Sequence, residues 1–593
     1  MSRMVVSQGA IVVALGLSLS AAAMGACGDD RSGFENRETK FELDASADAP
    51  ADCKLQCSLD RRSIVDSCTG QVVEACPDTL ACGAGACIEP CKAAAADRSS
   101  DGCEFYFQPP LFDSIFPRNC YAVFVVNTSL QPATLALELE GQPLDLSRST
   151  FRTTPGSAEL IRHEGALPPG ESVILFVTDH DPSQPVPTPP FGGPDNRVAC
   201  PAAVLPATYV DTVPRRTGVG GAFHLETNVP VGTTTIYPFG GADSYLPTAT
   251  LLLPVPTWGN EHMIINGWQT ASGGLPAAQI VASEDDTKVT ILPKRAVQDG
   301  NGVKGGPAGS PLEYRLSKGQ FLQLVQGEEL TGSIVSSDKP TTVIGGNSCA
   351  WVTPSGTGDI LAQQIPAYEQ WGSEYVGVGY RPRLGNEHEP MFYRVVAARD
   401  GTQLDYDPVV PAGAPVTLSA GESAIFESGA GDPFVVRTQD ADHPIYLAAY
   451  MTGSGDYNYA GDPEFVNVVP SKQYLNAYTF YADTTYDETS LVVVRAKTDD
   501  SFEDVWLECA GVLTGWKPVG TRGQYEWLRV DLQRGGGPGD TFGASVCQVG
   551  LQRMNSKGAF TATLWGWAYT ASYAYPGGMA QRKLVDVPLA PVN

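Results

Sequence analysis

The sequence predicts an all-β protein, built from tandem antiparallel β-sandwich repeats that follow a small disulfide-rich module. Three observations support this class. The 593 residues include 63 Gly and 46 Pro among short Val- and Thr-containing runs, which is typical of strands and turns. A pattern of strand, Ser or Thr, proline and strand recurs along the chain. Eight of the 14 cysteines fall within residues 53–103. A β-propeller is the alternative architecture.

Composition sets limits on the partners of this chain. Hydrophobic residues make up 42% of the sequence and charged residues 18%, which is enough apolar material for packed cores. The 66 acidic residues against 39 basic ones give a net charge of −27. Such a charge repels a phosphate backbone, so we expect no nucleic-acid partner.

The first 26 residues are typical of a lipoprotein signal peptide, with Arg3 ahead of an apolar stretch at 11–19. The ending Met-Gly-Ala-Cys27 resembles a bacterial lipobox, in which the cysteine is acylated and becomes the mature amino terminus. We therefore expect export and a membrane anchor at Cys27, in the outer membrane or at the cell surface; secretion with Cys27 unmodified is the alternative. Residues 27–52 are acidic and poor in apolar residues, which predicts a disordered tether.

The next segment, residues 53–103, is predicted to be held together by disulfides. Zinc is the competing interpretation, but the segment has no histidine and no C-x2-C spacing. Two cysteines near the carboxyl terminus are plausible partners within one repeat. If Cys27 is lipidated, an odd number of cysteines remains, and Cys349 is the candidate for the unpaired thiol. The cysteines expected in disulfides are Cys53, Cys57, Cys68, Cys76, Cys82, Cys87, Cys91, Cys103, Cys509 and Cys547.

Residues 104–593 are predicted to contain four β-repeats, at 104–250, 251–365, 366–470 and, more divergent, 471–593. The Ser/Thr-to-proline pattern ends at Pro230, Pro340 and Pro444. A Leu-x-x-Gly turn precedes each of these prolines, and a Trp-Gly pair opens repeats two and three. In the third repeat, seven alternating runs are predicted to be the strands of one antiparallel sandwich: 375–378, 392–397, 403–406, 416–418, 423–427, 434–438 and 445–450.

Several of these segments carry a family resemblance. Residues 281–291, 330–349, 371–376, 461–465 and 473–480 are similar to the amino-terminal domain family of IgGFc-binding proteins. With the lipobox, the acidic tether and the Cys-rich lead-in, the chain resembles bacterial lipoproteins of the myxobacterial type. The resemblance implies an extracellular role in recognition or adhesion, and it does not identify the ligand. It assigns no motif for contact with Fc to residues of this sequence.

No catalytic or metal-binding residues are predicted. The sequence lacks a G-x-S-x-G elbow placed between a strand and a helix, and it lacks H-E-x-x-H. The polar groups 179–181 and 386–389 are interpreted as solvated loops. Structural calcium at the acidic turns 284–286 and 455–462 is an alternative to their interpretation as ordinary turns. No cofactor is expected.

A Tyr-, Gly- and Asn-rich loop is the best candidate for a binding site. Its proposed binding residues are Asp456, Tyr457, Asn458, Tyr459 and Asp462. The alternating run Trp565, Trp567 and Tyr569 offers either a binding face or core, with core favoured. We therefore expect a lipid-anchored, non-enzymatic cell-surface protein that binds an extracellular protein or glycan. The alternatives are a secreted polysaccharide hydrolase and a structural envelope protein.

Overall fold

The computed structural model describes residues 54–58, 61–113, 118–185, 197–244, 246–270, 274–353 and 357–589. The chain divides into residues 1–40 and a compact unit of residues 41–593, and all described residues belong to the second. The predicted signal peptide (1–26), the tether (27–52), Cys27 and Cys53 lie outside the described residues. No helix within the described ranges has the length and apolar character needed to cross a bilayer.

The prediction of an all-β chain with a disulfide-rich lead-in is confirmed. The lead-in joins short strands and one helix through the disulfides Cys57–Cys82, Cys76–Cys87 and Cys91–Cys103. Pro90 begins the helix, where its missing N–H costs no hydrogen bond. The elements are β1 (Leu55–Cys57), β2 (Ser63–Asp66), β3 (Val72–Ala75), β4 (Ala81–Gly83), β5 (Ala86–Ile88) and α1 (Pro90–Asp97).

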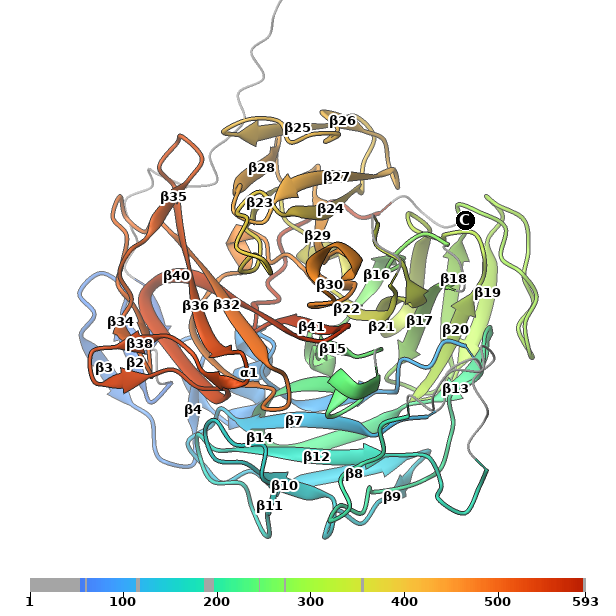
Figure 1. Ribbon diagram of the computed structural model, residues 1–593, viewed down its shortest axis with the longest axis horizontal. Coiled ribbons are helices and arrows are strands. Elements are labelled where there is room, and N and C mark those ends of the chain that lie inside the picture. The colour runs from blue at the N-terminus through green and yellow to red at the C-terminus, as the bar shows by residue number, and fades with distance from the viewer. Residues whose placement is uncertain are drawn as a thin grey trace, which may run out of the picture. The chain divides into compact units, whose positions relative to one another are not determined.

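Four sets of strands follow, which we call repeats 1 to 4 (Figure 1). Repeat 1 contains β6 (Gly102–Phe107), β7 (Tyr121–Asn127), β8 (Leu135–Leu139), β9 (Gln142–Pro143), β10 (Thr150–Arg152), β11 (Ile161–Arg162), β12 (Ser172–Thr178), β14 (Phe223–Tyr237), η1 (Gly241–Ser244) and β15 (Thr248–Leu251). Repeat 2 contains β13 (Gly218–Gly221), η2 (Val255–Thr257), β16 (Gly259–Met263), β17 (Pro276–Ala282), β18 (Thr287–Leu292), β19 (Leu312–Leu316), β20 (Gln320–Val325), β21 (Ile334–Ala350) and β22 (Asp359–Ile365).

Repeats 3 and 4 complete the chain. Repeat 3 contains η3 (Tyr368–Gln370), β23 (Glu374–Gly377), β24 (Pro390–Ala397), β25 (Thr402–Asp407), β26 (Thr417–Leu418), β27 (Ser423–Gly429), β28 (Phe434–Thr438), β29 (Ile445–Met451), η4 (Gly455–Tyr457) and β30 (Glu464–Asn467). Repeat 4 contains η5 (Ser471–Gln473), β31 (Leu475–Ala482), β32 (Glu488–Ala496), β33 (Val505–Leu507), β34 (Gly511–Val512), β35 (Lys517–Val519), β36 (Tyr525–Arg534), β37 (Gly537–Pro538), β38 (Thr541–Phe542), β39 (Ser545–Val546), β40 (Gly550–Ala568) and β41 (Ala571–Pro576).

One long strand organises each repeat by pairing with two different sets of neighbours. The first part of β14 pairs with β6 and β8, and its second part pairs with β7 and β15. β21 changes in the same way from β16 and β18 to β17 and β22, and β40 changes from β31 and β33 to β32 and β41. In repeat 3 the long strand is divided into β28, which pairs with β23 and β25, and β29, which pairs with β24 and β30.

The recurrent Ser/Thr-to-proline pattern marks the point of this change. The pairing of β14 with β6 skips residues 227–230, and the pairing of β21 with β16 skips residues 337–340, so each strand has a bulge at this point. The hydroxyl of Thr227 donates to the Val229 carbonyl at 2.7 Å, and that of Ser337 donates in the same way to the carbonyl two residues on. A proline closes each bulge because a residue outside the ladder needs no N–H donor.

The last strand of each repeat forms an inner set. β15 contacts β22 and β41, and β30 contacts the same two strands, so the four strands enclose a common interior (Figure 1). The Gln363 side chain crosses this interior and donates to the carbonyls of Ala249 (2.8 Å) and Ala574 (3.1 Å). After β41 the chain returns to the start of repeat 1, where the Ser100 N–H donates to the Met579 carbonyl at 2.8 Å.

Candidate functional site

The predicted binding loop, residues 453–462, rests on a buried arginine. The Arg383 side chain is fully buried and donates to Glu389 at 2.6 Å. It also donates to the carbonyl of Thr452 at 2.8 Å, and its guanidinium lies 3.6 Å from the ring centroid of Tyr457. A buried ion pair whose arginine makes several further hydrogen bonds holds its neighbours in one geometry. We call residues 453–462 the tyrosine loop. Arg383 fixes the base of this loop, and its tip lies in solvent.

The tip of the tyrosine loop presents an aromatic pair. Tyr459 is 48% exposed and Tyr569, in the turn between β40 and β41, is 57% exposed; their ring centroids are 5.5 Å apart. They are the only exposed Phe, Trp or Tyr side chains in the part of the chain that the structure describes. The Thr570 N–H donates to the Tyr459 carbonyl at 2.7 Å, which joins the turn to the loop.

The backbone conformation at the tip of the tyrosine loop also constrains the position of Tyr459. Asn458 and Tyr459 are consecutive non-glycine residues with φ of 55° and 62°. This left-handed conformation is unfavourable for residues with a Cβ, especially for one as bulky as tyrosine, and it persists only where surrounding contacts impose it. The loop therefore carries local strain at the residue that exposes its aromatic ring.

The other predicted loop residues have different positions. Asp456 and Asn458 are exposed beside Tyr459, whereas Tyr457 lies under Arg383 and Asp462 is buried. Tyr457 and Asp462 therefore support the loop from inside and cannot contact a large partner directly. Trp565 and Trp567 are buried core residues, and Tyr569 is exposed because β40 ends one residue before it.

Asp462 belongs to a group of buried carboxyls inside the inner strands. Asp359, Asp462 and Glu464 are at most 1% exposed, and one oxygen of each has no hydrogen-bond partner. Burial raises the pKa of Asp462 to about 7, and it raises the pKa of Asp359 and Glu464 well above the usual range. Carboxyls so enclosed have no access to a polysaccharide chain, so they do not form the open groove that a glycosidase needs.

The polar groups at 179–181 and 386–389 have structural partners. Asp179 accepts the backbone N–H of Cys200 at 2.8 Å, and the His180 ring contacts the Gln184 carbonyl at 3.1 Å. His388 pairs instead with Asp432 at 2.8 Å. Neither group therefore gathers its side chains into a metal site.

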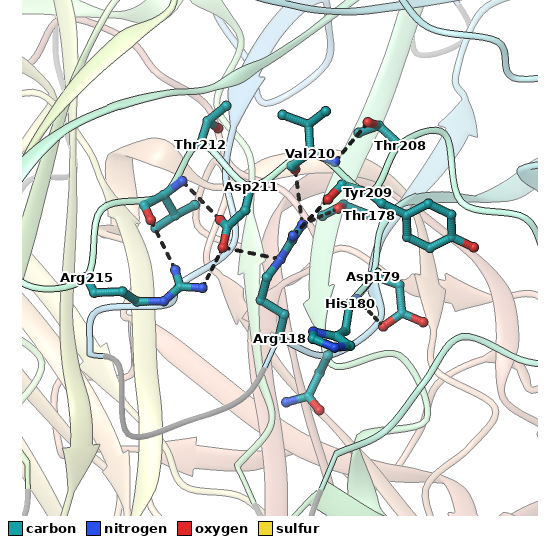
Figure 2. A network of polar contacts seen from close by, with 12 residues as sticks. Arg118, Thr178, Asp179, His180, Thr208, Tyr209, Val210, Asp211, Thr212 and Arg215 are labelled. Atoms are coloured by element: carbon teal, nitrogen blue, oxygen red, sulfur yellow. Dashed lines mark hydrogen bonds and ion pairs between the residues drawn. The ribbon is translucent and has the colours of Figure 1, made fainter. Parts of the chain in front are cut away.

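A polar network beside Asp179 and His180 also stabilises the fold (Figure 2). Arg118 donates to the carbonyls of Tyr209 (2.9 Å) and Val210 (3.1 Å) and to the Thr178 hydroxyl (2.6 Å). Asp211 lies 3.6 Å from the Arg118 guanidinium and accepts from Arg215 at 2.6 Å. The network fixes the segment after residue 207 against the end of β12, with its charged groups already paired.

The remaining cysteines have distinct roles. Cys120 pairs with Cys200, and Cys509 pairs with Cys547. Cys68 is also disulfide-bonded. Cys349 is the free cysteine among the described residues, and burial raises the pKa of its thiol to about 12. A thiol that remains protonated at neutral pH is a weak nucleophile.

Comparison with known proteins identifies the family. The model of the family described as "IgGFc binding protein" matches residues 248–566, more than half of the chain. The chain belongs to the IgGFc-binding protein family. The human IgGFc-binding protein is 27% identical over 248 residues, which are 42% of this chain and 4% of the human protein. The chain therefore matches only a small part of the length of this relative.

The family match can be placed on the structure. It begins at β15, includes the tyrosine loop and ends within β40, just before Tyr569. The human relative is named for binding the Fc region of IgG, and the family is one of binding proteins rather than enzymes. The disulfide-rich lead-in and most of repeat 1 lie before the matched region.

Proposed function

We propose that this chain is an exported binding protein that holds an extracellular protein ligand on the tyrosine loop. The observation that carries the proposal is an exposed aromatic pair: Tyr459 on the tyrosine loop, whose base Arg383 fixes, and Tyr569 on the turn that is hydrogen-bonded to this loop. Tyrosines supply large contact area at low cost in conformational entropy, and Gly, Ser and Asn beside them supply adaptable hydrogen bonds. The family membership supports recognition of a protein over a glycan.

The proposal includes the cellular location. Acylation of Cys27 would anchor the chain in the outer membrane or cell surface of a bacterium, and the acidic tether would hold the folded unit away from the lipid. The disulfides support export, because such bonds persist in oxidising compartments. Metabolic labelling with a palmitate analogue tests the anchor: the full chain should be labelled and a Cys27→Ala variant should not.

Binding is tested with an array of extracellular proteins, including IgG Fc, and of glycans, probed with the purified full chain at 0.15 M and about 0.5 M salt. We expect saturable binding to a protein that survives high salt. Replacing Tyr459 and Tyr569 by serine should weaken it by a factor of about 30 or more, the loss typical of central aromatic contacts.

The matched control replaces Val409 and Val416 by serine, since these side chains are also apolar and exposed, at 69% and 54%. This control should bind like the original chain. Binding that disappears at high salt would reflect the net charge alone. Binding that survives in the tyrosine variant but not in the valine variant would refute the assignment of the site.

A further inference from the structure

A histidine and three glutamates meet on one face of the sheet in repeat 1. In the register of this sheet, Glu226 on β14 lies opposite Glu104 on β6, and His224 lies opposite Tyr106 on β6 and Glu138 on β8. Side chains two residues apart on a strand point to the same face. The three adjacent strands therefore place the side chains of Glu104, Tyr106, Glu138, His224 and Glu226 on the same face of the sheet.

The imidazole of His224 lies between the carboxylates. Its Nδ1 is 2.7 Å from Glu138 Oε1, and its Nε2 is 3.0 Å from Glu104 Oε1 and 3.9 Å from Glu226 Oε1. The ligand atoms of Glu104, His224 and Glu226 all lie within 4.8 Å of one another. Ligands bound tetrahedrally at about 2.0 Å from a zinc ion are about 3.3 Å apart, a spacing bracketed by the two distances from Nε2.

The contact between His224 and Glu138 is of the kind that orients metal-binding histidines in other proteins. A ligating histidine nearly always donates its second ring N–H to a carboxylate or carbonyl, which fixes the tautomer and orients the free nitrogen. If Nδ1–H donates to Glu138, Nε2 presents its lone pair toward Glu104 and Glu226. His224 is itself buried, with 4% of its side chain exposed, so the ring has little freedom to turn away.

The charges around His224 and a buried hydroxyl without a partner also favour the binding of a cation at this place. Glu104 and Glu226 face each other directly across two strands, an arrangement in which like charges destabilise a sheet. Within the described chain, the ion pairs of Glu104, Glu138 and Glu226 are all with His224. The Tyr106 ring stacks on the imidazole at 4.3 Å, and its buried hydroxyl has no hydrogen-bond partner.

We propose that Glu104, His224 and Glu226 bind one divalent transition-metal cation of the zinc class, with Glu138 holding His224 in position. One imidazole nitrogen and two carboxylates suit such an ion better than the all-oxygen shells that calcium and magnesium prefer. The side chains of Glu104 and Glu226 are 34% and 61% exposed, which gives the ion a path from solvent. The site joins β6, β8 and β14, so the ion would brace the start of repeat 1.

The experiment titrates ZnCl2 into the chelator-treated full chain and measures heat, stoichiometry and melting temperature. We expect one saturable site per chain, a higher melting temperature with zinc, and no comparable response to Ca²⁺. Glu226→Gln is the decisive variant, because Glu226 is exposed and lies beyond hydrogen-bond distance of His224. It should fold normally and bind zinc at least about 100-fold more weakly.

The matched control is His388→Gln, which removes an exposed histidine–aspartate pair in repeat 3. This variant should retain the zinc site. Co²⁺ in place of zinc should give visible absorption bands with the original chain and with His388→Gln, but not with Glu226→Gln. The proposal is overturned if the original chain shows no saturable zinc site. It is also overturned if Glu226→Gln binds zinc as tightly as the original chain, because the cluster would then be an ion pair alone.

Discussion

The buried carboxyl of Asp462 makes the stability of the folded chain depend on pH. Its pKa is raised to about 7 by burial, against 3.8 for an exposed aspartate. The folded state therefore retains a proton that the unfolded state releases, and stability falls as pH rises from about 4 through about 7. At about 1.36 kcal/mol per pH unit, the cost grows from below about 1 kcal/mol at pH 4 to about 4 kcal/mol at pH 8.

Asp462→Asn removes this titration while keeping the size and shape of the side chain. The variant should unfold at higher urea than the original chain at pH 8, and the two should differ little at pH 4. The measurement is the free energy of unfolding from urea denaturation at pH 4, 6 and 8. A difference between the two proteins that stays constant within about 1 kcal/mol across this range would refute the reasoning, since the carboxyl would then titrate equally in both states.

Two further predictions concern contacts that hold the fold. Arg383→Met should lower the free energy of unfolding, measured by urea denaturation, by about 3–5 kcal/mol, because it leaves Glu389 charged and buried. Adding Glu389→Gln to this variant should restore at least about 1 kcal/mol. If the effects of the two substitutions are strictly additive, the prediction is wrong. Replacing Cys509 and Cys547 by serine opens a 38-residue loop and should cost about 4 kcal/mol in the same assay. Cys349→Ala, which removes an unpaired cysteine, should lower the free energy of unfolding by less. An equal decrease would contradict the argument that the disulfide stabilises by restricting the unfolded chain.

Local sequence patterns were sufficient to locate many of the strands. All seven runs predicted in the third repeat coincide with strands β23 to β29, because alternating apolar residues and hairpin turns act over a few neighbouring positions. The recurring proline pattern also marked equivalent places in β14 and β21, although its cause, a bulge where the strand changes partners, required the structure. Cysteine density likewise indicated disulfides without fixing which cysteines pair.

Tertiary structure decided what the strands bring together. β30 is four buried residues without alternation, so no local period predicts it, yet it places Glu464 in the interior shared with β15, β22 and β41. In the same way, alternation puts His224 and Glu226 on one face, but only sheet register places Glu104 and Glu138 beside them. The physical reason is that periodicity fixes which way a side chain points, whereas its cross-strand neighbours come from distant segments chosen by packing of the whole chain.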